Sequence, residues 1–414
     1  MVPDRSKLIF LADMESFYAS VETSLNPAWR GKPVVVCGDP ERRRGIVLAA
    51  SKEAKAYGIK TGFLAGEYRR LCPEVILVKP RMHTYLQFSL RIMEIFRQFS
   101  DRVLPYSIDE LFLDMTGCEK LFGPPQEMAR EMIRRVWEET GIRCRIGIGE
   151  NPLQAKMACD CFAKKSSEGI FALNHENYAF YTWPLPVSSL FGVGSRMERH
   201  FQRMAIRTIG HLARLPRESL RRRWGVNGEI LWLNAHGIDY STISPATASE
   251  EQKGVSHNMT LPRDYVKESE IKVVLLELCE EVCFRARALG KMGRTVSVYC
   301  RGADFRHSSG FLRQQRLPEP TAAAHQVYPW VLDLFFRHWD RKPLRALGIR
   351  LSSLTDCREV QLSLFDNREK TEALYRAMDL VRAKFGRTSL FRASSLTAGA
   401  QLFDRANKIG GHEA

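Results

Sequence analysis

The sequence contains no pair of cysteines separated by two residues, which is the spacing typical of zinc ribbons and dithiol redox sites. Its ten cysteines fall mostly within apolar segments, and the C-x-C and C-x-x-x-C pairs lack a second half at zinc spacing. We therefore expect free, buried thiols in a reducing compartment, and neither disulfides nor a zinc centre.

Long apolar runs are also missing. No stretch approaches the roughly 20 residues that a membrane helix needs, and the first residues lack the architecture of a signal peptide. These absences predict a cytoplasmic protein with no membrane partner.

Acidic residues are scarce relative to basic ones. The chain of 414 residues holds 47 Asp and Glu against 62 Lys and Arg, a net charge of +15 at pH 7. The basic residues are spread along the chain, which favours a polyanionic partner such as nucleic acid over a disordered basic arm. A merely soluble basic surface is the alternative. The length alone predicts two to four domains.

Strand and helix patterns alternate up to about residue 175. Short apolar runs at 8–12 and 33–36 are typical of buried strands, and long helices are expected at 82–99 and 124–139. This alternation favours a domain with a central sheet. Residues 186–237 have an all-helical pattern instead, rich in arginine.

A polar, Pro-containing linker is expected at 241–253. Strand and helix patterns from 254 to 352 follow in the order β-α-β-β-α-β, the split βαβ arrangement. A tail follows, with a helix expected at 367–385.

Two adjacent acids interrupt the apolar segment PYSIDELFLD at 105–114. Consecutive residues of a strand point to opposite faces, so Asp109 and Glu110 serve one site only at a hairpin tip or a bulge. Pro105 and Ser107 are compatible with such a turn. The alternative is a solvent-exposed turn, in which adjacent acidic residues are more common.

Asp13 ends the apolar run 8–12, at the end of a sheet where ligands usually bind. It is equally suited to cap the helix that follows. Together, Asp13, Asp109 and Glu110 supply hard oxygen ligands suited to magnesium, and a two-metal phosphoryl-transfer site needs about this number.

Three motifs carry a resemblance to a known family. The segments DMESFYASVE (13–22) and YSIDELFLDMT (106–116) resemble the two acidic motifs of Y-family DNA polymerases, the DinB/UmuC/ImpB translesion group. The segment GIGENPLQAKMACDCFAKKSSEG (147–169) resembles the third palm motif of the family, and the order and approximate spacing agree.

The resemblance implies a multidomain α+β fold built like a right hand. It divides the chain into a ferredoxin-like palm (1–30 and 80–180), small fingers (31–79), a helix-hairpin-helix thumb (181–240), a linker (241–253), a split β-α-β little finger (254–355) and a C-terminal tail (356–414).

The implied function is template-directed addition of deoxynucleotides from deoxynucleoside triphosphates to a primer 3′ end on template DNA, specialised for synthesis past damaged bases. A non-catalytic polymerase-like scaffold in a mutagenic repair complex is the alternative, although such family members have lost the metal carboxylates. A nucleotide cyclase shares a ferredoxin-like palm, but it has no use for a basic thumb.

In the implied site, Asp13, Asp109 and Glu110 hold two magnesium ions with help from the Met14 carbonyl. Tyr18 stands at the steric-gate position, where an aromatic ring leaves no room for a ribose hydroxyl; a core aromatic is the alternative. Phe17 presents its backbone N–H to the phosphates.

Lysines supply the implied triphosphate contacts. Lys52 and Lys55 stand where family members often carry Tyr and Arg, and they keep positive charge without the bidentate fork of arginine. A further cation comes from Lys164 or Lys165, between which the register does not decide, with Lys156 the next candidate. A solvated helix face is the alternative for Lys52 and Lys55.

Two regions resemble DNA-binding surfaces. In LFGVGSRMERHF (190–201), which resembles a helix-hairpin-helix, Gly192 and Gly194 let backbone N–H groups approach a phosphate next to Arg196. A plain interhelical turn is the alternative.

The strand pattern TVSVYCR (295–301) alternates, so that Val298 and its apolar neighbours face the helices. Ser297, Tyr299 and Arg301 then lie on an open basic face suited to duplex phosphates. A solvated sheet face is the alternative.

The pentapeptide QLSLF at 361–365 matches the bacterial sliding-clamp-binding motif. Gln361 hydrogen-bonds in that motif, and apolar anchors fill pockets on the clamp: Leu362, Leu364 and Phe365. An edge strand is the alternative. Its position before a further tail resembles UmuC-like members with an internal clamp-binding motif.

Overall fold

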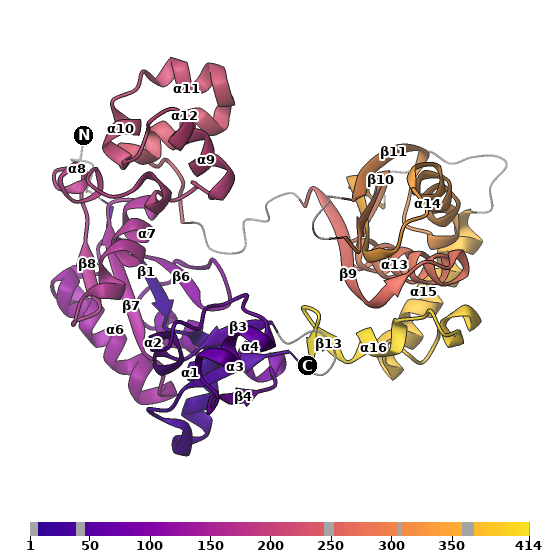
Figure 1. Cartoon of the computed structure of the whole chain (residues 1–414), viewed down its shortest axis with the longest axis horizontal. Helices are drawn as coiled ribbons and strands as arrows, with labels where there is room; N and C mark the ends of the chain where they lie inside the picture. Colours follow the sequence, from indigo (N-terminus) through magenta and orange to yellow (C-terminus); the bar gives the residue numbers. More distant parts are fainter. Residues whose placement is uncertain (1–6, 39–45, 244–251, 305–308, 358–367, 414) are drawn as a thin grey trace. The chain divides into compact units, whose positions relative to one another are not determined.

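The computed structural model describes residues 7–38, 46–243, 252–304, 309–357 and 368–413. The chain forms two compact units, Met1–Ala248 and Ser249–Ala414, each with its own sheets and helices (Figure 1). All ten cysteines lie in the described part, and none forms a disulfide; eight are buried, and Cys118 and Cys357 are half-buried. No described helix is both long and apolar enough to cross a membrane.

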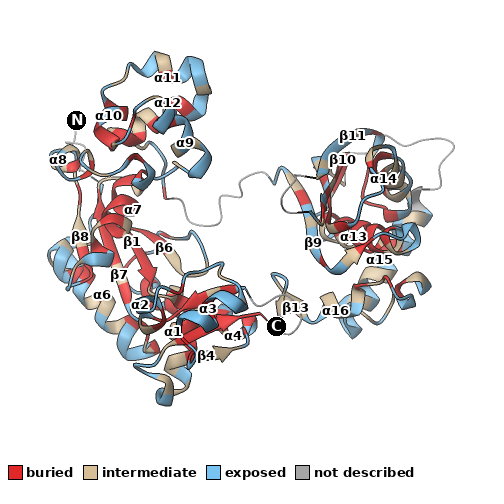
Figure 2. Ribbon diagram, viewed as in Figure 1, coloured by how far each residue is buried: buried red, intermediate tan, exposed pale blue. Residues whose placement is uncertain are grey.

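The first unit is built on a five-stranded sheet with β1 (Ile9–Met14) in its centre. The other strands, in the order β5-β6-β1-β7-β8, are β5 (Val103–Pro105), β6 (Glu110–Asp114), β7 (Cys144–Gly149) and β8 (Ile170–Ala172). Strand β1 pairs antiparallel with both neighbours and is buried along its whole length (Figure 2). A central position explains why its sequence is a continuous apolar run.

Three helices pack on this sheet: α4 (Met82–Arg97), α6 (Pro125–Thr140) and α7 (Pro152–Cys161). Helix α1 (Phe17–Leu25) follows β1 in the chain and packs against a second, smaller sheet. Helix α7 lies directly on β7 because two glycines of that strand leave room for it. A Cβ on Gly147 would lie 2.1 Å from the Ala155 carbonyl oxygen, and one on Gly149 would lie 2.5 Å from the Ala155 nitrogen. The glycines therefore let α7 pack closely on β7 and β1.

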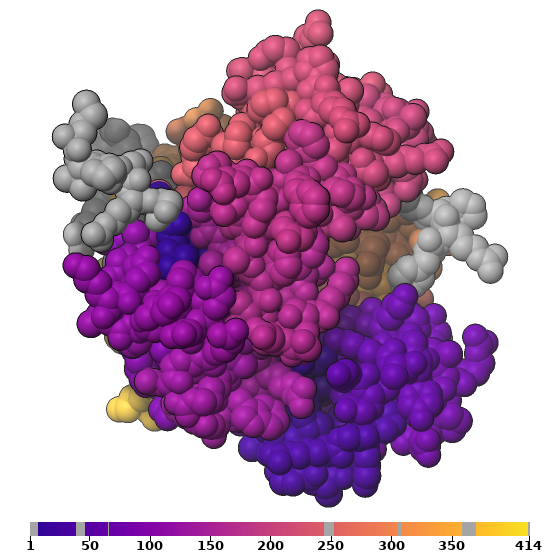
Figure 3. Space-filling model, turned by 90° about the vertical axis from the view of Figure 1, so that its left-hand side faces the viewer, coloured from indigo at the N-terminus to yellow at the C-terminus, as the bar shows by residue number. Residues whose placement is uncertain are grey.

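A smaller sheet follows the order β3-β2-β4. It comprises β2 (Val34–Cys37), β3 (Val47–Ala50) and β4 (Ile76–Val78), with helices α2 (Lys52–Ala56) and α3 (Ala65–Leu71). The fully buried Tyr68 anchors α3 in the core of this layer. In Figure 3 this indigo segment lies below the magenta segment that carries β7 and α7.

Residues 186–237, which the sequence predicted to be all-helical, contain four α-helices: α9 (Ser195–Arg203), α10 (Ile209–Ala213), α11 (Arg217–Trp224) and α12 (Val226–Ala235). The short helix α8 (Tyr178–Thr182) comes just before them. They share an apolar core around Phe201, Leu220 and Leu231. Gly228 allows α12 to cross α11 closely, since a Cβ there would lie 2.2 Å from the Leu220 carbonyl oxygen.

The second unit contains a four-stranded antiparallel sheet in the order β11-β10-β12-β9. Its elements are β9 (Gly254–Tyr265), α13 (Glu268–Ala288), β10 (Lys291–Gly302), β11 (Gly310–Thr321), α14 (Ala324–His338) and β12 (Leu344–Asp356). This is the β-α-β-β-α-β order that the sequence predicted. Both helices pack on one face of the sheet, against buried side chains such as Val296 and Val298.

The tail folds back onto the second unit. It forms α15 (Arg368–Phe385), the short helix α16 (Leu402–Ala406) and a small hairpin of β13 (Lys408–Ile409) and β14 (His412–Glu413), drawn in yellow tones in Figure 1. Tyr375 of α15 enters the apolar core and is 2% exposed.

Ion pairs and hydrogen bonds fasten the tail to α13. Arg287 donates through Nε and Nη2 to both oxygens of Asp379, at 2.7 and 2.8 Å. Glu280 accepts two hydrogen bonds from Arg392, and the backbone N–H of Gln401 donates to Glu277. The tail is thus a packed part of the unit.

A candidate active site on the five-stranded sheet

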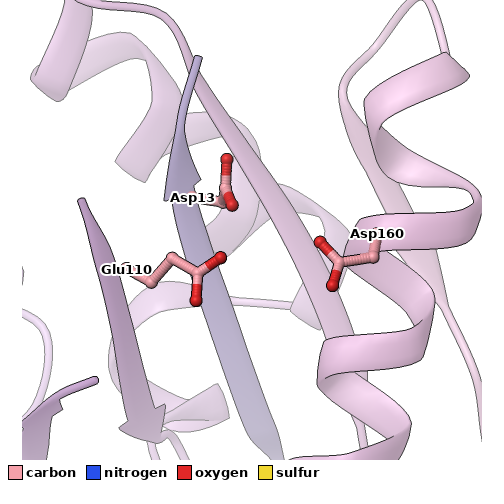
Figure 4. A group of neighbouring side chains, drawn as sticks. All are labelled: Asp13, Glu110 and Asp160. Carbon is pink, nitrogen blue, oxygen red and sulfur yellow. The ribbon is translucent and has the colours of Figure 1, made fainter. Parts of the chain in front are cut away.

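Three carboxylates from separate elements converge at one end of β1. Asp13 comes from β1, Glu110 from β6 and Asp160 from α7, and one oxygen of each lies within 4.8 Å of the others (Figure 4). Asp13 and Glu110 are directly opposed on antiparallel neighbours, so their side chains share a face of the sheet. Helix α7 brings Asp160 to the same face.

The adjacent acids Asp109 and Glu110 do lie at a hairpin, as the sequence predicted. The N–H groups of Tyr106 and Ser107 both donate to the Glu110 carbonyl oxygen, at 2.9 and 3.1 Å, which closes the turn between β5 and β6. Glu110 is the first strand residue and points into the carboxylate cluster.

Asp109 belongs to the turn itself. Its carbonyl oxygen accepts a hydrogen bond from the Met14 N–H at 2.9 Å, which ties the turn to the end of β1. Its carboxylate accepts from the Ser107 hydroxyl at 2.6 Å. The third carboxylate of the cluster is therefore Asp160, and the role of Asp109 as a metal ligand stays a prediction.

Asp160 was missed by the sequence reasoning, although a signal was present. It lies four residues after Lys156 and four residues before Lys164, so the three side chains share one face of the helical segment. An acid flanked in this way by two lysines on a helix that starts beside the sheet is a candidate for the site.

Lysines alternate with these acids. The Lys164 ammonium lies 2.7 Å from Asp13 and 2.7 Å from Asp160, and Lys156 lies 2.6 Å from Glu110 and 3.1 Å from Asp160. The side chain of Lys156 is only 9% exposed, so its charge requires these partners. Of the two lysines that the register left open, Lys164 faces the acids.

Burial and a side-chain hydrogen bond with Glu110 together raise the pKa of Asp13 to about 7, against the opposing charge of Lys164. Because burial penalises the ionised form of this carboxylate, the ionised form needs additional positive charge nearby. A hard divalent cation would supply that charge, and carboxylate oxygens are its preferred ligands. The donor set therefore fits magnesium.

The Tyr18 ring is held by a stacked tyrosine, which is itself hydrogen-bonded to a buried carboxylate. Its ring stacks on that of Tyr85 with 4.5 Å between the centroids. The Tyr85 hydroxyl donates to Glu22 at 2.7 Å, and Arg81 donates to both oxygens of the same buried carboxylate. Burial, with the charge of Asp109, raises the pKa of Tyr18.

The start of α1 meets a lysine of α2. Ser16 precedes α1 with a left-handed backbone (φ 49°), and its hydroxyl accepts a hydrogen bond from the Lys55 ammonium at 2.7 Å. Phe17, the first residue of α1, is buried. Lys52 is exposed on the first turn of α2. The structure thus brings Lys55 to the N-terminus of α1.

Two family models match the chain, and both describe the impB/mucB/samB family. One covers residues 12–160, and the model of the C-terminal domain covers residues 252–364. Together they span more than half of the sequence. The chain belongs to the Y-family DNA polymerases.

Curated relatives match over nearly their whole length. DNA polymerase IV 2 of Bacillus subtilis (strain 168) is 51% identical, and the match covers 99% of each chain. DNA polymerase IV 2 of Halalkalibacterium halodurans is 48% identical, with 98% of this chain and 99% of the relative covered. The tail after the pentapeptide therefore has counterparts in these relatives.

A solved Y-family DNA polymerase chimera has the same fold. It superposes with a TM-score of 0.70 at 22% sequence identity, over 84% of this chain and 99% of the chimera. The architecture is thus the multidomain α+β fold of a Y-family polymerase.

The helical segment of this Y-family chain carries a cationic pocket on α9. Its lining consists of Arg196, Arg199, His200 and Arg203. The sequence had singled out only Arg196 of these. Gly194 lies directly before α9, and Gly192 has a left-handed backbone (φ 95°) beside Leu231.

The open face of the second sheet is basic in this Y-family member. Alternation along β10 is as predicted, because Val296, Val298 and Cys300 are buried, whereas Arg301 is exposed. Tyr299 is half-buried and Ser297 is 6% exposed, so the face is less open at Ser297 than expected.

Neighbouring strands add two exposed arginines to that face. Arg350 of β12 lies opposite Ser297, and Arg316 of β11 lies opposite Thr295. The pentapeptide Gln361–Phe365 and most of the predicted linker lie outside the described residues.

Proposed function

We propose that this protein is a magnesium-dependent, template-directed DNA polymerase that extends a primer 3′ end and copies past damaged template bases. The observation that carries the proposal is the meeting of Asp13 and Glu110 on neighbouring strands, in a chain that belongs to the Y-family. Family scaffolds without activity are marked by loss of these acids, and this chain keeps them.

Asp13, Asp109 and Glu110, with the Met14 carbonyl, would hold two magnesium ions. The metals, when bound, lower the pKa of the primer 3′-hydroxyl and neutralise charge on the triphosphate and the leaving pyrophosphate. The contacts between the Asp109 carbonyl and the Met14 N–H keep the two acidic segments in register for this role.

The residues around the carboxylates are suited to bind a deoxynucleoside triphosphate. Lys164 and Lys55 bring ammonium groups to the carboxylates and to the N-terminus of α1, where backbone N–H groups such as that of Phe17 favour anions. Lys52 is close to Lys55 in the sequence, and Lys165 follows Lys164. Both are exposed and would add long-range attraction for the triphosphate.

Tyr18 would act as the steric gate. Its ring cannot turn aside freely, because it stacks on Tyr85, which is anchored on the buried Glu22. A rigid ring is what discrimination against one extra hydroxyl group requires, since a mobile side chain would yield to the ribose.

DNA would contact two basic surfaces without base-specific readout. In the proposed thumb (181–240), these contacts come from Gly192, Gly194 and the arginine face of α9. In the proposed little finger (254–355), they come from the open sheet face with Ser297, Tyr299 and Arg301. The proposed palm and fingers comprise residues 1–30 with 80–180, and residues 31–79.

The bacterial sliding clamp would recruit the enzyme through Gln361, Leu362, Leu364 and Phe365. The support is the match of QLSLF to the clamp-binding pentapeptide.

A primer-extension assay tests the proposal, on an undamaged template and on one with an abasic site. We expect magnesium-dependent extension on both and loss of extension in Glu110→Gln, which removes the charge but keeps the shape of the side chain. Glu119→Gln, on a surface helix outside the site, is the matched control. Full extension by Glu110→Gln would refute the active-site assignment.

A further inference from the structure

Arg145 lies on the catalytic face of the five-stranded sheet. It is directly opposite Asp13 on the neighbouring strand, so the two side chains leave the sheet on the same side. Its side chain is 13% exposed, which is low for an arginine and requires satisfied hydrogen bonds.

The guanidinium joins two segments that are far apart in the sequence. Its Nε donates to the Glu15 carboxylate at 2.9 Å, and its Nη1 donates to the Ser166 carbonyl oxygen at 3.1 Å. Glu15 follows Met14, and its own N–H donates to the Arg143 carbonyl oxygen at 2.9 Å. One end of the bridge is therefore the turn that carries Asp13 and Met14.

The other end is the segment that carries Lys164. The residues Ala163–Lys165 form a single helical turn, and the Ser166 N–H closes it by donating to the carbonyl oxygens of Phe162 and Ala163. A donor on the Ser166 carbonyl oxygen thus fixes the residue at which this turn ends.

The chain leaves room for Arg145 at Gly169. A Cβ at that position would lie 2.6 Å from Nη1 and 2.9 Å from Cδ of Arg145, and the backbone there is left-handed (φ 74°). The segment after the lysine turn is thus shaped around the arginine side chain.

We propose that Arg145 is a positioning residue that holds the Lys164 turn against the Asp13–Glu15 turn for nucleotide binding. The inference rests on the proposed polymerase function. Lys164 is held by Asp13 and Asp160 in this structure, but a cation on Asp13 and a triphosphate would both compete for those contacts. The bridge from Arg145 to Glu15 and Ser166 uses none of them, so it persists when Lys164 turns to the triphosphate.

Single-nucleotide insertion kinetics with primer–template DNA test the role of Arg145. In Arg145→Ala we expect the KM for the deoxynucleoside triphosphate to rise on the order of tenfold, the effect of losing one charge-assisted hydrogen-bonded contact, while kcat stays within about twofold. Arg145→Lys keeps the charge beside Glu15 but loses the second donor, and should fall between Arg145→Ala and the wild type.

Arg143→Ala is the matched control, because Arg143 is a neighbouring exposed cation that stacks on Trp137. Its KM should equal that of the wild type. Glu15→Ala and Arg145→Ala should be non-additive when combined, since both break one bridge.

An unchanged KM in Arg145→Ala, or an equal KM rise in Arg143→Ala, would overturn the proposal. Equal losses of kcat in Arg145→Ala and Arg145→Lys with no change in KM would also overturn it. Absence of extension by the wild type would instead refute the polymerase function itself.

Discussion

The Lys164 ammonium lies 2.7 Å from the Asp13 carboxylate, although the two residues are 151 positions apart in the sequence. This pair begins a chain of alternating charges that continues through Asp160 and Lys156 to Glu110. The lysines balance the charge of these acids. A cation held by Asp13 and Glu110 would compete with the lysines for these carboxylates, and Lys164 would then be available to a triphosphate.

Asp109 and Asp160 are the two candidates for the third metal ligand beside Asp13 and Glu110. Removing the charge of each should have a different effect on polymerase kinetics. We expect Asp109→Asn to reduce kcat by about a thousandfold or more, because a metal ligand is lost. Asp160→Asn should retain activity and mainly raise the KM for the nucleotide, since its partners in the structure are the two lysines.

Magnesium titrations of primer extension would measure both variants. A strongly raised magnesium requirement in Asp160→Asn, with a normal one in Asp109→Asn, would assign the metal to the cluster of Asp13, Glu110 and Asp160 and contradict the sequence-based set.

Tyr18→Ala should admit ribonucleotides, because the ring beside the sugar is lost. Tyr85→Leu should shift sugar selection in the same direction but less, since it removes the stacked ring that supports Tyr18. Tyr85→Phe keeps the stacked ring and loses only its hydrogen bond to Glu22, so its shift should be smaller than that of Tyr85→Leu. Insertion kinetics with matched ribonucleotides and deoxyribonucleotides would measure the ratio, and unchanged selection in Tyr18→Ala would exclude Tyr18 as the gate.

Replacing Leu364 and Phe365 by alanine should abolish stimulation by the sliding clamp and leave basal extension unchanged. The two anchors lie outside the proposed catalytic residues, so only recruitment should suffer. Primer extension with and without loaded clamp would show this. Full stimulation of the double variant would rule out the pentapeptide as the docking segment.

The tail should contribute to the stability of the second unit. Asp379→Asn breaks the two-point contact with the largely buried Arg287, whose guanidinium also lies over the Tyr375 ring. We expect a loss of about 2 kcal/mol in the free energy of opening α13, measured by amide hydrogen exchange. Arg376→Gln, at an exposed position of α15, is the control. Equal protection in both variants would contradict the role of the ion pair.

Acid should destabilise the second unit through His257 on β9. Burial, with the positive charges of Arg405 and Arg285, lowers the pKa of His257 from 6.5 to about 4, against the opposing charge of Glu281. The unfolded chain therefore binds a proton on this histidine at a higher pH than the folded chain, and stability falls as the pH drops from about 6.5 towards about 4.

His257→Gln removes this titration. Thermal unfolding of the full chain between pH 7 and pH 4.5 should show a smaller loss in the variant than in the wild type, and no difference in slope above pH 7. Parallel losses in both proteins across this window would show that His257 is not the group responsible.

Much of the fold could be predicted because its elements are encoded locally. The continuous apolar run at 8–12 predicted a buried strand, and β1 lies in the centre of its sheet. The alternation in TVSVYCR predicted which side chains of β10 face the helices, since a strand has a period of two residues. The helix of the tail was predicted at 367–385 and is α15 (Arg368–Phe385), but its packing on α13 was not predicted. Its partners on α13 are charged residues that look like an ordinary solvated helix face in sequence.

The sequence by itself determined the residue types of the site: adjacent acids in a turn, an acid at the end of a strand, and lysines in a helical segment. Only the tertiary structure decided which of them meet. Strand pairing sets Glu110 opposite Asp13, and the glycines of β7 admit α7 and so bring in Asp160. The directions of side chains at a turn depend on how distant segments pack together, and so do long-range contacts. A local sequence pattern therefore does not predict them.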